Sequence, residues 1–187
     1  MQLKSICNTG ARQLALAALL LLPACRATIF MPLLPQDPGS TLTQGEEVNL
    51  HFFTNIANFD TGIALQSGGS YRLNMAILSN WIDSSIDTNE DELPLDERGF
   101  ADSKMRYEFV KYVKRSRGHR WFELMLYQPN CRDASLKGVS DLSFDEQSTS
   151  YNFVASCDGK LTLFVNDSPG FYRNNVGYAN IALSRID

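Results

Sequence analysis

A short stretch near the end of the chain, NDSPGFYRNNVG from Asn166 to Gly177, concentrates oxygen-bearing side chains around a Pro-Gly turn. Such residues are common in ordinary turns. Calcium also selects them, because it takes six to eight oxygens from carboxylates, amide groups and backbone carbonyls. Asp167 offers a carboxylate, and Asn174 and Asn175 offer amide oxygens. The loop therefore has two interpretations, a structural turn and a weak calcium site with an affinity on the order of 10⁻⁴ to 10⁻³ M.

Residues suited to catalysis are scarce. The sequence has two histidines, His51 and His119, and neither lies in a recognisable catalytic motif. The chain also lacks G-x-S-x-G, H-E-x-x-H and P-loop sequences. Nucleophilic and acid–base mechanisms need a nucleophile beside a base, or paired acid and base groups, and no motif indicates either. We therefore predict a binding protein and not an enzyme.

The stretch LTLFVNDSPGFYRNNVGYANIAL, which contains the loop, resembles the C-terminal strand, loop and strand of the PA-IL type of calcium-dependent galactophilic lectin. Every named position of the family pattern N-D-x-P-G-x-Y-x-N-N-x-G is present from Asn166 to Gly177. Upstream, NFDTGIALQSGGSYRLNMAILSNW (58–81) resembles the N-terminal strand pair of the family. The resemblance implies a galactose-binding-like β-sandwich that binds carbohydrate through calcium and breaks no bond.

Carried over by position, the resemblance also implies which residues bind the ion and the sugar. The side-chain ligands would be Asp167, Asn174 and Asn175, and the backbone-carbonyl ligands would be Phe171 and a residue just after Trp81, near Ser84. In such lectins two vicinal sugar hydroxyls complete the calcium shell. Asp167, Arg173 and Asn174 are then the expected contacts for the sugar.

Three features depart from the family pattern. The sugar-contacting His-Pro-x-x-Gly segment has no counterpart with a histidine, the nearest text being LPLDERG at 93–99. Arg173 replaces a small residue, so its side chain can block a sugar or contact an acidic one. The acidic insertion at 83–104 is longer than the family needs and can cover the site. The sequence therefore does not identify the glycan.

The segments that must position the loop have the sequence pattern of short β-strands. Seven segments are rich in β-branched or aromatic residues with period-two alternation, and turn residues separate them. These segments are 48–53, 71–78, 105–113, 120–127, 151–155, 160–166 and 177–183. No stretch shows a helical stripe with caps. This pattern predicts an all-β fold, an antiparallel β-sandwich or jelly roll, over residues 46–187.

The first residues have the pattern of an export signal. Lys4 and Arg12 precede an apolar run at 14–24 that is too short to span a bilayer. The run ends in Leu-Pro-Ala-Cys, which resembles the bacterial lipobox and predicts a lipid on Cys25, although ordinary cleavage after Ala24 or Ala27 is the alternative. Residues 25–45 contain several prolines and few charges, which predicts an extended tether. We expect an exported, periplasmic protein that its lipid anchors to the outer membrane.

Cysteine usage and charge agree with export. Removal of residues 1–24 takes away Lys4 and Arg12 and changes the formal net charge from −4 to −6. Such an acidic chain is a poor partner for nucleic acid. Cys131 and Cys157 remain beside Cys25, and in an oxidising compartment we expect them to form a disulfide rather than a metal site.

Two charge clusters interrupt the strands. The first is the acidic stretch 83–97, and the second is a basic run from Lys111 to Arg120 that flanks an expected hairpin turn. The basic run is either a solvated hairpin tip or a contact for anionic lipid headgroups or a partner. The acidic stretch suggests an alternative function, a periplasmic lipoprotein that binds and inhibits a protein partner, such as an immunity protein for a secreted toxin.

Overall fold

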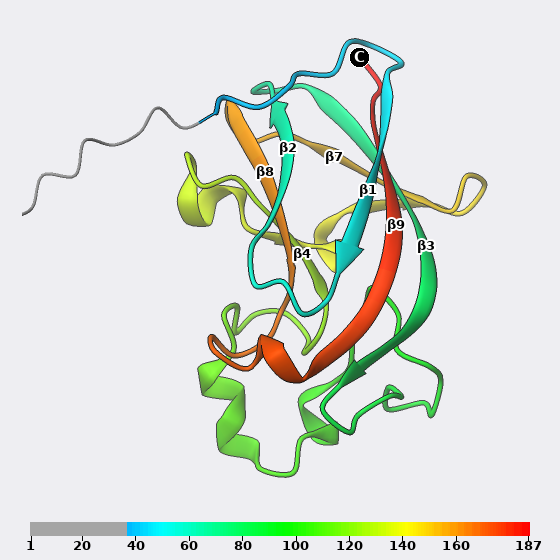
Figure 1. The fold of residues 1–187 in the computed structure, drawn as a ribbon, viewed down its shortest axis with the longest axis vertical. Helices are drawn as coiled ribbons and strands as arrows, with labels where there is room; N and C mark the ends of the chain where they lie inside the picture. The colour runs from blue at the N-terminus through cyan, green and yellow to red at the C-terminus, as the bar shows by residue number, and fades with distance from the viewer. Residues whose placement is uncertain (1–36) are drawn as a thin grey trace, which may run out of the picture. The chain divides into compact units, whose positions relative to one another are not determined.

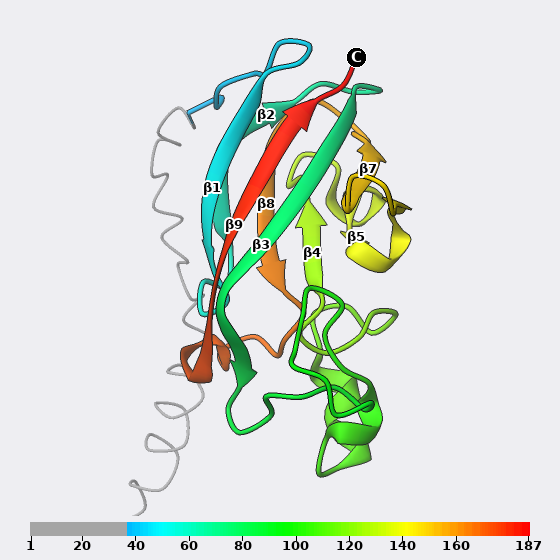
Figure 2. The same ribbon diagram turned by 90° about the vertical axis from the view of Figure 1, so that its right-hand side faces the viewer.

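Two antiparallel sheets, packed face to face, make up the part of the chain that the computed structural model describes, residues 37–187 (Figures 1 and 2). One sheet has the strand order β1-β9-β3-β7-β6, and the other has the order β2-β8-β4-β5. The strands are β1 (Glu47–Phe53), β2 (Phe59–Leu65), β3 (Ser70–Asp83), β4 (Leu124–Tyr127), β5 (Lys137–Gly138), β6 (Ser143–Asp145), β7 (Ser150–Val154), β8 (Gly159–Val165) and β9 (Asn175–Arg185). The predicted all-β antiparallel sandwich is confirmed.

Period-two alternation determines which side chains enter the core. In β1, Leu50 and Phe52 are buried while the intervening His51 is exposed, because successive side chains of a strand point to opposite faces. The core between the sheets includes the fully buried rings of Trp81, Phe122 and Phe164. Burying large aromatic side chains from both sheets stabilises their face-to-face packing.

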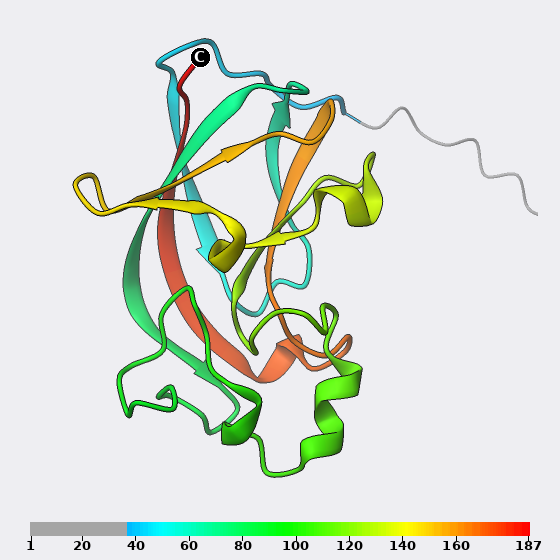
Figure 3. The same cartoon turned by 180° about the vertical axis from the view of Figure 1, so that it is seen from behind.

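The expected strand at 105–113 is wrong. Residues Glu108–Val113 form a 3₁₀ helix, η2, at one end of the sandwich (Figure 3). Tyr107 and Phe109 are exposed, and Met105 and Val110 only partly contact the core. The segment finds no neighbouring strand to complete its backbone hydrogen bonds, so alternation alone does not make it extended. The other 3₁₀ turns are η1 (Asp102–Lys104), η3 (Arg132–Ser135), η4 (Val139–Asp141) and η5 (Tyr172–Asn174).

Residues 37–45, which precede β1, contact the sandwich. Ser40 pairs with Ile63 as a β-bridge, and Leu42 is buried in the core, so residues 37–45 of the expected tether lie against the sandwich. The signal segment, Cys25 and the rest of the tether lie outside the described residues. Within residues 37–187, no helix has the length and apolar character needed to cross a bilayer.

The predicted disulfide is confirmed. Cys131 and Cys157 are bonded, with their Cα atoms 6.1 Å apart. The bond joins the segment that follows β4 to the segment that connects β7 with β8.

The acidic insertion is folded into the domain. Leu95 forms an isolated β-bridge with Trp81, and Phe100 forms one with Trp121. The side chains of Leu95 and Phe100 are buried in the core. Only its first four residues, 83–86, line the pocket described below. The insertion is therefore part of the sandwich at this end of the molecule.

Candidate metal and ligand site

The oxygen-rich loop joins the two sheets at one end of the sandwich (Figure 1). It leaves β8 after Val165 and enters β9 at Asn175. Gly170 has a φ of +93°, in the region that favours glycine, which lets the chain turn sharply after Pro169. The buried Tyr172 hydroxyl then donates a 2.8 Å hydrogen bond to the carbonyl of Val165. This contact holds the returning loop against the strand it left.

Asn166, the first residue of the motif, is a structural clamp. It is fully buried, its Oδ1 accepts from the Ser116 N–H at 2.9 Å, and its Nδ2 donates to the carbonyls of Ser116 and Arg120. One side chain therefore satisfies backbone groups of the segment that leads from η2 to β4. The motif uses this asparagine to attach that segment to the loop and not to present an oxygen to solvent.

Asp167 points into the site from the loop. It is 3% exposed. Its Oδ1 accepts from the Ser168 N–H at 2.6 Å, and its Oδ2 accepts from the Asn175 amide at 3.0 Å. Burial nevertheless raises the pKa of the Asp167 carboxyl, and these hydrogen bonds offset only part of that effect.

Asp83 is a second buried carboxylate that the sequence analysis did not identify as a site residue. The register of β3 against β9 pairs it with Asn175, so the end of β3 brings it to the loop. It is 6% exposed. Burial, together with the nearby charge of Asp167, raises the pKa of Asp83 to about 7. Neither carboxylate takes part in an ion pair among residues 37–187.

The two motif asparagines face these carboxylates differently. The exposed Asn174 donates a long 3.4 Å hydrogen bond from Nδ2 to Asp83 Oδ1. Asn175 is buried and donates from Nδ2 to Asp167 and to the carbonyl of Thr54. Its Oδ1 is buried without a hydrogen-bond partner in the described part of the chain. Such an orphaned acceptor is costly unless another group, such as a cation, completes it.

Phe171 and Ser84 also lie at the site, whereas Arg173 does not line it. The Phe171 ring is 63% exposed, and its residue forms part of the pocket wall together with Ser84. Ser84 has a φ of +57°, which is uncommon for a residue with a side chain. Its N–H donates to the Asn174 carbonyl at 3.3 Å, which ties the β3 end to the loop. Arg173 is exposed on η5.

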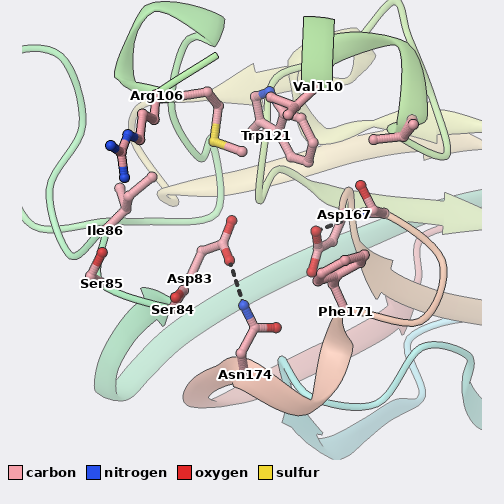
Figure 4. A pocket seen from close by; sticks show the side chains of 13 residues that line it. Asp83, Ser84, Ser85, Ile86, Arg106, Val110, Trp121, Asp167, Phe171 and Asn174 are labelled. Carbon is pink, nitrogen blue, oxygen red and sulfur yellow. Dashed lines mark hydrogen bonds between the residues drawn. The ribbon is translucent and has the colours of Figure 1, made fainter. Parts of the chain in front are cut away.

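A pocket of about 280 Å³ opens beside these groups. Figure 4 shows Asp83 and Asp167 extending toward the same space from β3 and from the loop, with Asn174 below them. The opposite wall is mostly apolar and comes largely from the η2 region. It consists of Ile86, Met105, Val110, Val113 and Trp121, with Arg106 at one side. The site thus has a polar floor and an apolar wall.

These donors suit a hard cation. Two carboxylates, two amide side chains and the neighbouring carbonyls are all oxygen donors, the type that calcium prefers. No group of three or more histidine, cysteine or acidic side chains in the described region is placed to hold a metal. A softer ion such as zinc finds no histidine or cysteine among the residues that line this pocket. The paired buried carboxylates fit an ion at this position, and the orphaned oxygen of the adjacent Asn175 is a further acceptor without a partner in the described residues.

The two charge clusters of the sequence neutralise one another in part. Three ion pairs join them or lie within the insertion: Arg120 with Glu90 at 2.7 Å, Lys114 with Asp102 at 2.7 Å and Lys104 with Glu92 at 3.1 Å. The expected hairpin at the basic run is wrong, because residues 114–123 form an irregular segment before β4 that Asn166 holds in place. The acidic insertion therefore presents less free charge than its sequence indicates.

A row of three side chains links this segment to η4. Ser116 Oγ lies 2.5 Å from His119 Nδ1, and His119 Nε2 lies 2.7 Å from Asp141 Oδ2. The residue types match a hydrolase triad, but Ser116 is 8% exposed and its N–H is bound to Asn166. The observed contacts thus describe a link between two loops.

Comparison with known proteins gives one kind of similarity. No protein-family model and no curated protein sequence matches the chain. Among solved structures, the chain is similar to one titled "EclA N-terminal domain; PllA-like lectin", with a TM-score of 0.45 and 19% sequence identity. The match covers 73% of this chain and 94% of that one. It assigns the chain to no family.

Proposed function

We propose that the site at the ends of β3 and β8 binds a calcium ion. The observation that supports this most strongly is the pair of buried carboxylates, Asp83 and Asp167, which have no cationic partner among the described residues. Burial raises the pKa of both carboxyls, and repulsion from the charge of Asp167 raises that of Asp83 further. A divalent cation between them would convert the repulsion into attraction.

The remaining ligands come from the motif and its neighbour. We assign Asn174 and Asn175 as amide ligands, and the carbonyls of Phe171 and of the residue at or near Ser84 as backbone ligands. The orphaned Oδ1 of Asn175 supports this assignment, because a bound ion would satisfy it. The number and type of these oxygens suit calcium better than magnesium, which demands a stricter octahedral geometry.

We further propose that the ion holds a carbohydrate, which makes the protein a calcium-dependent lectin-like binding protein without enzymatic activity. The complete N-D-x-P-G-x-Y-x-N-N-x-G pattern supports this class, together with the exposed position of Asn174 beside an open pocket. Asp167 and Asn174 would then contact the sugar as well as the ion. Arg173 is exposed next to Asn174, where it can meet an acidic substituent of a sugar that extends beyond the pocket.

The proposed setting is the bacterial envelope, with Cys25 carrying the lipid anchor. The apolar run that ends at this cysteine supports export and lipidation. Replacement of Cys25 by serine should move the protein from the membrane fraction to the soluble periplasmic fraction. An unchanged distribution would contradict the lipid anchor.

The test of the calcium site is a thermal unfolding series on oxidised residues 26–187, in calcium and in chelator. A site of about 10⁻⁴ M affinity adds about 2.7 kcal/mol of stability at a hundredfold excess of calcium, or about 5–10 °C in Tm. Asp167→Ala should abolish this rise, while Asp133→Asn on the distant η3 should keep it. Immobilised-glycan binding that chelator reverses would then support the lectin.

Two results would contradict the proposal separately. If calcium does not change the Tm, the loop is a structural turn, and the alternative of a protein partner becomes the better hypothesis. If calcium binds but no glycan is retained in its presence, the ion has a structural role only.

A further inference from the structure

A cluster of exposed apolar side chains projects from η2 and the residue before it. We call this cluster the aromatic tip; it consists of Tyr107, Phe109, Tyr112 and Val113, which are 50%, 67%, 58% and 53% exposed. Single exposed apolar residues are common on protein surfaces, but four within seven residues, three of them aromatic, indicate an interaction site. The tip does not belong to the calcium ligands, and the inference below does not depend on the proposed function.

The chain around the tip is basic, in a protein that is acidic overall. Residues 105–120 hold six lysines and arginines and one glutamate. Three of these cations bind other parts of the domain. Lys114 forms an ion pair with Asp102, and Arg120 forms one with Glu90. Arg115 lies 3.5 Å from the centre of the Phe164 ring and donates a hydrogen bond to Asn58. The other three are Arg106, Lys111 and Arg117. These three cations outnumber the single glutamate, so the chain around the tip carries a net positive charge.

These three cations lie on the aromatic rings of the tip itself. Arg106 lies 5.3 Å from the Tyr107 ring centre, and Lys111 and Arg117 lie 5.5 and 5.9 Å from that of Tyr112. The tip therefore combines two exposed tyrosine rings, with positive charges at their faces, and an exposed phenylalanine. This combination suits the headgroup region of a membrane, where aromatic rings enter the interface and lysine or arginine meets lipid phosphates.

We propose that the aromatic tip docks on the surface of a bilayer that contains anionic lipids. Charge complementarity identifies the partner, because anionic headgroups attract the net positive tip despite the acidic balance of the whole chain. The position of the tip agrees with such contact, since η2 lies at the end of the domain opposite to the first described residues (Figures 1 and 3).

Vesicle co-sedimentation tests the proposal, with residues 26–187 in chelator so that neither a lipid on Cys25 nor the calcium site contributes. We expect binding to vesicles of phosphatidylglycerol and phosphatidylcholine, little binding to phosphatidylcholine alone, and weaker binding as salt rises. Arg106→Gln and Arg117→Gln should each reduce the affinity about fivefold. The double variant Phe109→Ser, Tyr112→Ser should reduce it at least tenfold.

Matched controls separate the tip from the rest of the surface. Leu78→Ser removes an equally exposed apolar side chain from β3, and Arg132→Gln removes an exposed charge from η3. Both should leave binding unchanged, and unfolding midpoints should show that every variant is folded. Equal binding to neutral and anionic vesicles, an equal loss in the controls, or self-association that the Phe109 and Tyr112 changes abolish without any vesicle binding would overturn the proposal.

Discussion

Replacement of Asp83 by asparagine is expected to stabilise the calcium-free protein and to remove most of its response to calcium. Asparagine keeps the shape of the side chain and an acceptor for the Asn174 amide, which donates to Asp83 Oδ1 at 3.4 Å. It removes one of two buried negative charges, and thereby the repulsion from Asp167. The same charge attracts calcium, so its loss should weaken calcium binding by about tenfold or more.

The size of the effect follows from the pKa. A carboxyl with a pKa of 3.8 in the unfolded chain and about 7 in the folded one binds more protons when the protein is folded. Its contribution therefore lowers the free energy of unfolding as the pH rises between these two values, by at most about 4 kcal/mol. Asp167 acts in the same direction, because its pKa is also raised. Asp83→Asn should recover about 2–4 kcal/mol at about pH 8 and much less at about pH 4.

Urea unfolding of residues 26–187 and of the variant, at about pH 4 and about pH 8 in chelator and in about 10 mM calcium, measures these differences. The natural protein should gain more from calcium at the higher pH, where protons no longer compete for the carboxylates. The reasoning is refuted if Asp83→Asn is less stable than the natural protein in chelator at about pH 8. It is equally refuted if the variant keeps the full calcium response.

Three further predictions concern the framework of the domain. Asn166→Ala should lower the free energy of unfolding by about 3 kcal/mol in urea titrations, because it leaves buried backbone groups of Ser116 and Arg120 without partners; a loss below about 1 kcal/mol would contradict the clamp. Replacing both Cys131 and Cys157 by serine should cost about 3 kcal/mol, and an unchanged midpoint under oxidising conditions would show that the bond does not constrain the unfolded chain. Gly99→Ala should cost more than about 3 kcal/mol, since Gly99 has a φ of +62° and a Cβ there would lie 1.9 Å from the Trp121 carbonyl oxygen; a well-folded variant of natural stability would contradict this geometry.

The sequence predicted the elements whose signal is local. Alternation of apolar residues predicted β1, β3, β7, β8 and β9. Most of these strands bury alternate side chains against the other sheet, whereas β8, which lies between β2 and β4, buries five consecutive residues at 161–165. Export and cysteine count predicted the disulfide. The same alternation misled at 105–113, since a strand also needs a neighbour to complete its hydrogen bonds, and the sequence does not indicate where sheets end.

The sequence identified some residues of the candidate site and missed others. The spacing of Asp167, Asn174 and Asn175 could be read from the sequence because one turn holds all three. Asp83 could not, because two irregularities in the pairing of β3 with β9 determine that it faces Asn175. Each irregularity shifts the register of a strand, and a shift of one residue moves a side chain to the other face.

By itself the sequence determined the local chemistry: an oxygen-rich loop, a set of short strands and the cysteines that can pair. Only the tertiary structure decided how distant residues combine. It placed Asp83 beside Asp167, used the first asparagine of the motif as a clamp, and joined acidic Glu90 and Asp102 to basic Arg120 and Lys114. The physical reason is that local spacing limits what a segment can offer, whereas burial, ion pairing and strand register depend on segments far apart in the chain.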